Sequence, residues 1–170
     1  KGVSVPATAE KVPASAALDR LGKFDFPVNL NEVTHAFFER TAALEGGDLG
    51  AAMTAVVQSN GADEKAVATL AQTPAYNSML RTTCVATMLQ AGHARNALPQ
   101  KATANVNCRI FLQESVQDVQ RTLAQVVGDP ITVTPLGEPF SSPPSPLDPD
   151  LMARVERITS DMWPGTIVIP

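Results

Sequence analysis

Cysteine is scarce in this sequence: Cys84 and Cys108 are the only two among 170 residues. Two cysteines are too few for a disulfide-rich scaffold or for a structural zinc site. Aromatic residues make up only 5% of the chain. No apolar run approaches the roughly 18 residues that a membrane span needs. These shortages exclude a disulfide-stapled mini-protein, and we expect no membrane crossing in this stretch.

Positive charge is also in short supply. The chain carries 13 Lys and Arg against 17 Asp and Glu, and the formal net charge is −4. The basic residues are scattered, which argues against nucleic acid as the main partner. Residues 1–10 lack the apolar segment of a signal peptide, which leaves the compartment open. A hydrophobic content of 44% in a chain of this length predicts one domain with a core, or one domain and part of another.

The first half of the chain has helical signals. Asn29, with Glu32 three residues later, predicts a capped helix start, and Gly46-Gly47 predicts its end. Apolar spacing and turn residues predict three further short helices, over residues 13–22, 48–59 and 63–72.

The pattern changes after Arg81. Residues 82–91 predict a strand, 92–99 a turn-rich connection, and 101–111 a strand whose apolar and polar residues alternate. A helix that opens at Ser115 and a strand over 131–136 follow. The order strand, strand, helix, strand indicates an α+β fold.

The last part resembles a linker followed by new structure. Prolines crowd residues 135–149, and Asp148 begins a helix that extends to Met162. Residues 166–169 predict a buried strand. We interpret residues 147–170 as the start of a second domain.

No complete catalytic set is visible in the sequence. The two histidines, His35 and His93, lie far apart, and neither has the spacing of a zinc or nucleophile motif. We interpret His35 as a helix-surface or core histidine. His93 lies in a turn beside polar residues, which makes it a weak candidate for a substrate contact.

Two further observations leave alternatives open. If the hairpin is centred near Asn96, Cys84 and Cys108 lie opposite each other, either as small core residues or as a cross-strand disulfide. Arg109 lies on the polar face of its strand. It is either solvated, or paired with a carboxylate, or it holds a substrate carboxylate with its planar guanidinium.

Residues 82–111 resemble the hairpin of a known lid domain, through Gly92, Ala94, Asn96, Leu98, Pro99 and Arg109. Residues 17–40 and 143–165 are similar to the same proteins. The family is zinc metallopeptidase family twenty, which includes glutamate carboxypeptidase, aminoacylase, acetylornithine deacetylase, succinyl-diaminopimelate desuccinylase and carnosinase.

The resemblance implies a ferredoxin-like antiparallel sheet of four strands with helices on one face. Residues 1–140 would form the lid, or dimerisation, domain, with a helical insertion over about 30–79. Residues 141–170 would form a linker and a stub of the zinc-binding catalytic domain. Only three strands are evident in the sequence, so we expect the first strand to lie before Lys1.

The resemblance also implies a function. The parent protein would be a homodimeric enzyme with two zinc ions that hydrolyses peptide or N-acyl amino-acid amide bonds. Its zinc ligands and its glutamate base would lie outside residues 1–170, so that this fragment binds no zinc and is inactive alone. Asn96 and Arg109 would bind the carboxylate end of the substrate, commonly across the dimer.

One departure supports an alternative. Gly2 occupies the position at which the lid of this family has a histidine that polarises the scissile carbonyl. A non-catalytic dimerisation or ligand-binding module that retained the lid fold is therefore a second hypothesis.

Overall fold

The computed structural model describes residues 2–8, 13–94, 96, 99, 101–139 and 142–170, with the main chain alone at residues 2–8 and 13. The chain divides into two compact units, one made of Lys1–Pro27 and Thr82–Ser142 and the other of Val28–Arg81 and Pro143–Pro170. None of the described helices is long and apolar enough to span a membrane. The elements are β1 (Gly2–Thr8), α1 (Pro13–Lys23), α2 (Glu32–Glu45), α3 (Gly47–Gln58), α4 (Glu64–Ala71), α5 (Pro74–Leu80), β2 (Thr83–Ala91), β3 (Lys101–Arg109), α6 (Val116–Val127), β4 (Thr134–Pro135) and α7 (Pro149–Met162).

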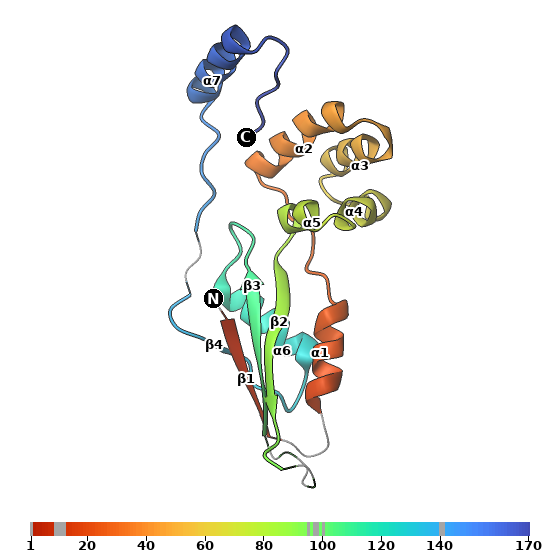
Figure 1. The fold of residues 1–170 in the computed structure, drawn as a ribbon, viewed down its shortest axis with the longest axis vertical. Helices are drawn as coiled ribbons and strands as arrows, with labels where there is room; N and C mark the ends of the chain where they lie inside the picture. Colours follow the sequence, from red (N-terminus) through yellow and green to blue (C-terminus); the bar gives the residue numbers. More distant parts are fainter. Residues whose placement is uncertain (1, 9–12, 95, 97–98, 100, 140–141) are drawn as a thin grey trace. The chain divides into compact units, whose positions relative to one another are not determined.

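The first unit is built on an antiparallel sheet with the strand order β2-β3-β1-β4 (Figure 1). With α1 after β1 and α6 between β3 and β4, this is the ferredoxin-like arrangement, and the predicted α+β fold is confirmed. The expectation that the first strand lies before Lys1 is wrong. That strand is β1, which pairs with β3 from Gly2 opposite Asn107 to Thr8 opposite Lys101. Val3, Val5 and Ala7 alternate with polar residues, glycine and proline, but the run is short and Pro6 weakens the strand signal.

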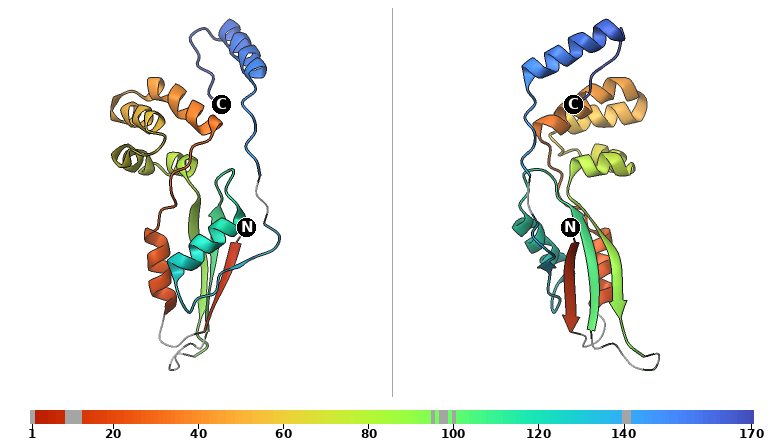
Figure 2. Two further views of the ribbon diagram at one scale, coloured as in Figure 1. Left: turned by 180° about the vertical axis from the view of Figure 1, so that it is seen from behind. Right: turned by 60° about the vertical axis from the view of Figure 1, so that its left-hand side comes forward.

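The core of this unit lies between the sheet and its two helices. On β3, Ala102, Ala104 and Val106 are buried while the alternate residues are half-buried or exposed. They face α1 and α6; in the left view of Figure 2, α6 crosses in front of the strands and α1 lies beside them. The alternation in residues 101–111 therefore predicted the buried face correctly. The buried cluster comprises Ala17, Leu21, Phe26, Val106, Val119, Leu123, Val127, Ile131 and Val133.

Helix starts follow the predicted chemistry with small shifts. Helix α2 begins after Asn31 rather than Asn29, because the Asn31 side chain accepts a hydrogen bond from the Thr34 main-chain nitrogen at 2.9 Å. The hydroxyl of Thr34 lies 3.0 Å from the Asn31 main-chain nitrogen and accepts its hydrogen bond, so Thr34, and not Glu32, completes the capping box. Ser115 and Asp148 cap α6 and α7 as predicted.

Three features of the structure differ from the predictions. Helix α5 was not foreseen, although Pro74 at its first turn is a recognised start signal. The strand expected over residues 131–136 shrinks to Thr134–Pro135, because only two residues pair with β1. Residues 166–169 form no strand in the described structure, since a strand requires a partner to satisfy its main-chain hydrogen bonds.

The helical part of the second unit has a core of its own. Helices α2 to α5 bury Phe38, Ala52, Met53, Val56, Ala66, Val67, Leu70 and Leu80. A hydrogen bond of 2.8 Å from the Asn29 nitrogen to the Leu80 oxygen joins the first and last residues of this helical insertion. The two ends of the insertion thus lie side by side, and no strand of the sheet is interrupted by it.

The predicted break between the second and third insertion helices is confirmed at Asn60-Gly61. Gly61 has a φ of +81°, a backbone conformation that residues other than glycine rarely adopt. A Cβ at this position would lie 2.5 Å from Cγ1 of Val28. Both backbone conformation and space therefore require glycine in this turn.

Helix α7 belongs to the same unit as the insertion. Arg40 of α2 donates hydrogen bonds to the carboxylate of Glu156 on α7 and, at 2.9 Å, to the main-chain oxygen of Val168. Helix α7 buries none of its residues. Its apolar stripe, Leu151, Val155, Ile158 and Met162, is exposed.

The insertion core generates a stability prediction. Replacement of Phe38, which is 0% exposed, by alanine is expected to lower the free energy of unfolding by about 3–5 kcal/mol, because it leaves a cavity. The control is Leu44→Ala on the same helix. Leu44 is 54% exposed, and its loss should cost less than about 0.5 kcal/mol. Urea unfolding followed by circular dichroism measures both, and equal losses would contradict the assigned core.

Candidate functional site

Arg109 is the last residue of β3, paired in register with Thr83. Its side chain is exposed on the face of the sheet that points away from α1 and α6. Within the part of the chain that the structure describes, this side chain makes no ion pair or hydrogen bond. The guanidinium therefore has its planar set of donors available for an acceptor from outside the chain, such as a carboxylate.

Asn96 and His93 lie in the connection between β2 and β3, at the other end of these strands from Arg109. Both side chains are exposed. Eight residue steps along β3, at about 3.3 Å each, separate the two ends of the strand by about 26 Å. One copy of the chain therefore does not bring Asn96 and Arg109 together around a small ligand. Leu98 of the hairpin motif lies outside the described residues.

The two cysteines form a disulfide. Cys84 on β2 and Cys108 on β3 are direct partners in the register, with a Cα–Cα distance of 4.1 Å. The sulfurs pack against the core of the first unit from its helix-covered face. Of the two alternatives left open by the sequence, the structure has the cross-strand disulfide.

The start of β2 is anchored by Thr82 as well. The Thr82 hydroxyl lies 2.7 Å from the main-chain nitrogen of Phe111, whose hydrogen bond it accepts, and it donates to the carboxylate of Glu114. Thr82 is fully buried. A buried hydroxyl that both donates and accepts satisfies its own polar atoms and joins two segments that are distant in sequence.

An apolar edge is the feature that the sequence did not reveal. Among the described strands β2 pairs with β3 alone, and Val85, Met88 and Leu89 on it are 64%, 58% and 58% exposed. Across its nine residues β2 has no charged residue and no proline. Charged residues and prolines are what usually protect an edge strand from pairing with another chain. The lack of any charged residue or proline in residues 82–91 was the available signal.

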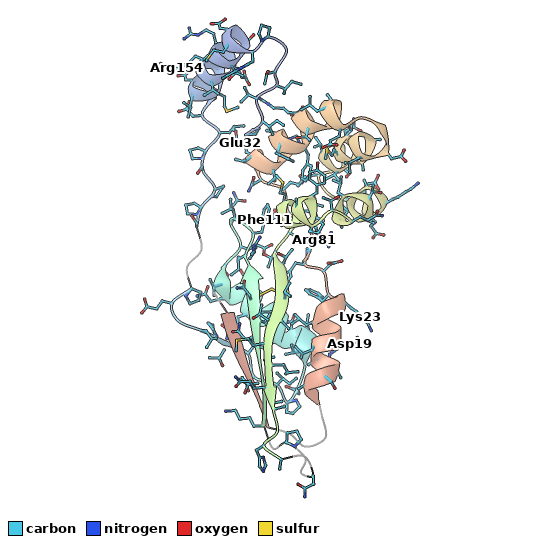
Figure 3. All side chains as sticks on the ribbon, in the orientation of Figure 1. Asp19, Lys23, Glu32, Arg81, Phe111 and Arg154 are labelled. Atoms are coloured by element: carbon cyan, nitrogen blue, oxygen red, sulfur yellow. A yellow bond between two sulfur atoms is a disulfide. The ribbon has the colours of Figure 1, made fainter. Side chains whose placement is uncertain are left out.

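The other charged groups near the sheet have local structural roles. Lys23 and Asp19 form an ion pair of 2.8 Å on the exposed side of α1 (Figure 3). The side chain of Arg20 donates to the main-chain oxygens of Val126 and Val127 at the carboxyl end of α6. The described residues include no group of three or more His, Cys, Asp or Glu that could hold a metal ion.

Comparison with known proteins places this fold in a family. Residues 14–132 match the family described as the peptidase dimerisation domain of the M20 peptidases, over most of the chain. The chain belongs to this family. The resemblance drawn from the hairpin residues is thereby confirmed.

Two curated relatives are similar to the chain, and both are named N-fatty-acyl-amino acid synthase/hydrolase PM20D1. The Xenopus tropicalis protein is 31% identical over 99 residues, which cover 57% of this chain and 19% of the relative. The Mus musculus protein is 38% identical over 56 residues, which cover 33% of this chain and 11% of the relative. The matched parts thus cover less than a fifth of these relatives. No solved structure matches the chain.

Tyr76 has the one resolved pKa shift among the described residues. Its hydroxyl donates to Glu45 at 2.8 Å, and this hydrogen bond, followed by burial and the negative charge of Glu45, raises the pKa of Tyr76 above its ordinary value. Since the folded pKa is raised, the contribution of Tyr76 to stability is complete below the unfolded pKa of about 10 and is lost as the pH rises through the folded pKa.

This shift can be measured directly, because the chain has one tyrosine. In Glu45→Ala the pKa of Tyr76 should fall toward its ordinary value, since the acceptor and its charge are both removed. Spectrophotometric titration of tyrosinate absorbance reports the pKa. Glu39→Ala, which changes an exposed residue on the same helix, should leave the pKa of Tyr76 unchanged. A Tyr76 pKa that is the same in all three proteins would show that Glu45 is not its partner.

Proposed function

We propose that this chain is the lid and dimerisation portion of an M20-type hydrolase that cleaves peptide or N-acyl amino-acid amide bonds. The observation that carries the proposal is the match of residues 14–132 to the peptidase dimerisation domain family, on a sheet with an exposed apolar edge. The two relatives are named as enzymes of N-fatty-acyl amino acids. Such substrates combine an amide bond with a carboxylate, which is the group that Arg109 is suited to bind.

Dimerisation through β2 is the first part of the proposal. The unpaired main-chain groups along this edge can form hydrogen bonds with a second copy of β2, which extends the sheet across the dimer. Val85, Met88 and Leu89 would be covered in the same contact. The opposite edge has no continuous strand of this length, because it is divided between the two residues of β4 and the part of β1 that β4 does not cover.

This contact can be tested on the chain itself. Met88→Lys adds a charge that must be desolvated at the edge, and we expect the dissociation constant of the dimer to rise about tenfold or more. The control is Ile158→Lys, which places the same charge on the exposed stripe of α7 and should leave the constant unchanged. Sedimentation equilibrium measures both. If Ile158→Lys dissociates the dimer and Met88→Lys does not, the dimer contact lies at α7 and not at β2.

Substrate binding is the second part. We assign the substrate carboxylate to Arg109 and contacts elsewhere on the substrate to Asn96 and, more weakly, His93. If two copies of β2 pair antiparallel, the hairpin of one copy lies at the end of the sheet where Arg109 of the other copy lies. Three strand spacings of about 4.8 Å then separate the two strands β3 by about 14 Å. That geometry supports contacts with different parts of one substrate across the dimer.

In the full-length protein, Arg109→Ala should raise KM for substrates with a free carboxylate by about tenfold or more, because a charge-assisted hydrogen bond is lost. Substrates whose carboxylate is amidated should be less affected. Lys65→Ala, at an exposed position of the helical insertion, is the control for loss of a positive charge. Unchanged KM and kcat in Arg109→Ala would remove Arg109 from the substrate site.

Residues 141–170 are proposed to be a linker and part of the catalytic domain, and residues 1–140 the lid with its insertion over about 30–79. The exposed stripe of α7 supports this assignment, because an amphipathic helix with no buried residue needs a partner for its apolar face. The described residues do not fit a metal centre. On the family resemblance, we place the ligands of the two zinc ions of the parent enzyme outside residues 1–170.

The alternative is a dimerisation or ligand-binding module without catalysis. It is favoured by Gly2, the first residue of β1, at the position where related lids have a histidine. The mass and zinc content of the protein isolated from its source distinguish the two. A mass well above 17.9 kDa with bound zinc supports the enzyme, and a mass near 17.9 kDa without zinc supports the module.

A further inference from the structure

Strand β2 is held to the sheet with almost no help from buried side chains. Thr83 and Cys84 are half-buried, and the seven residues that follow are all exposed. The register of a strand is normally specified by the side chains that it buries, and it is weakly specified where one face is not buried. Hydrophobic burial therefore does little to fix the position of β2 along β3.

The register of β2 is also interrupted. Ala86 pairs with Val106, but Met88 pairs with Asn105, so that Thr87 is an extra residue between the two halves of the strand. The Asn105 side chain donates to the Thr87 hydroxyl at 2.7 Å, which marks the bulge on the exposed side. A solvent-exposed hydrogen bond of this kind contributes little to stability, because water competes for both partners.

The disulfide is the strongest constraint within β2. It joins residues that are direct partners, Cys84 and Cys108, and they are separated by 24 residues in the sequence. Thr82 anchors the chain before the strand begins, whereas the disulfide fixes a residue inside the strand. A slip by one residue would move Val85 and Met88 to the helix-covered face, and the disulfide forbids this slip.

The disulfide is also open to chemistry. Both cysteines are half-buried, and Cys84 lies on the edge strand β2 while Cys108 lies on its inner neighbour β3. A dithiol such as dithiothreitol can reduce the bond by thiol–disulfide exchange. The S–S bond breaks, each cysteine sulfur becomes a thiol, and the two thiols of the reductant supply the two electrons and two protons and become a cyclic disulfide.

We propose that the Cys84–Cys108 disulfide is a redox-sensitive lock on the register of edge strand β2, which a thiol reductant opens. With the lock open, β2 separates from or slips along β3, and the surface made by Val85, Met88 and Leu89 loses its fixed form. A weakening of assembly through β2 follows, and this consequence rests on the proposed dimerisation.

The lock itself is tested by hydrogen exchange and mass spectrometry on the 170-residue chain with and without dithiothreitol. Amides of residues 88–91 should exchange about tenfold faster in the reductant, while those of α6 and of the helical insertion keep their rates. Reoxidation should restore slow exchange. Equal exchange of residues 88–91 in the oxidised and reduced chains would overturn the proposal.

A double variant, Cys84→Ala with Cys108→Ala, is the matched control. It should exchange rapidly in β2 whether or not dithiothreitol is present, because it has no bond to reduce. A variant that remains sensitive to the reductant would show that the reductant acts elsewhere. The reversible wild-type comparison decides the proposal even if the variant does not fold.

Sedimentation equilibrium of the same samples separates this proposal from the proposed dimer. A dimer whose dissociation constant rises about tenfold on reduction supports both. A chain that is monomeric in both states contradicts the dimer, while the exchange rates still decide the lock. A dimer with an unchanged constant, although β2 exchanges faster, overturns the link between lock and assembly.

Discussion

The packing of two helices against one face of strand β3 is the interaction on which the rest of the first unit depends. Ala102, Ala104 and Val106 are small, so α1 and α6 can lie close to the strand and cover it. Burial of apolar surface is the main favourable term in folding, and this face supplies it for the centre of the sheet. Because β3 must be central to bury that face, β1 pairs on one side of it and β2 on the other.

The two edges of the resulting sheet differ in a way that has functional consequences. The edge opposite β2 is divided between the two-residue strand β4 and the uncovered part of β1, whereas β2 offers one strand of nine residues without charge or proline. An unprotected edge of this length is suited to pair with another chain. The disulfide lies on the same strand, where packing contributes least, and it supplies covalently the constraint that burial does not. The edge suited to pairing with another chain and one end of the disulfide therefore both lie on β2.

The fold accommodates the helical insertion because the insertion has a hydrophobic core of its own. Phe37, Phe38 and Tyr76 form ring contacts within it, and its helices bury Phe38, Met53 and Leu70 completely. The Asn29–Leu80 hydrogen bond closes its ends. An inserted segment with its own core, whose two ends are hydrogen-bonded to each other, does not depend on the sheet for its stability. This explains how 54 consecutive residues, Val28–Arg81, can separate α1 from β2.

The sequence by itself determined the elements with strong local signals: the alternation of β3, the capped starts of α6 and α7, and the hairpin that sets Cys84 opposite Cys108. It also indicated the family, through the spacing from Asn96 to Arg109. Only the tertiary structure decided that residues 2–8 complete the sheet, that the cysteines are bonded, and that Asn96 and Arg109 lie at opposite ends of β3. It also showed that β2 is an exposed edge. Periodicity records which residues share a face, but pairing partners, edges and distances are set by contacts between segments far apart in the chain.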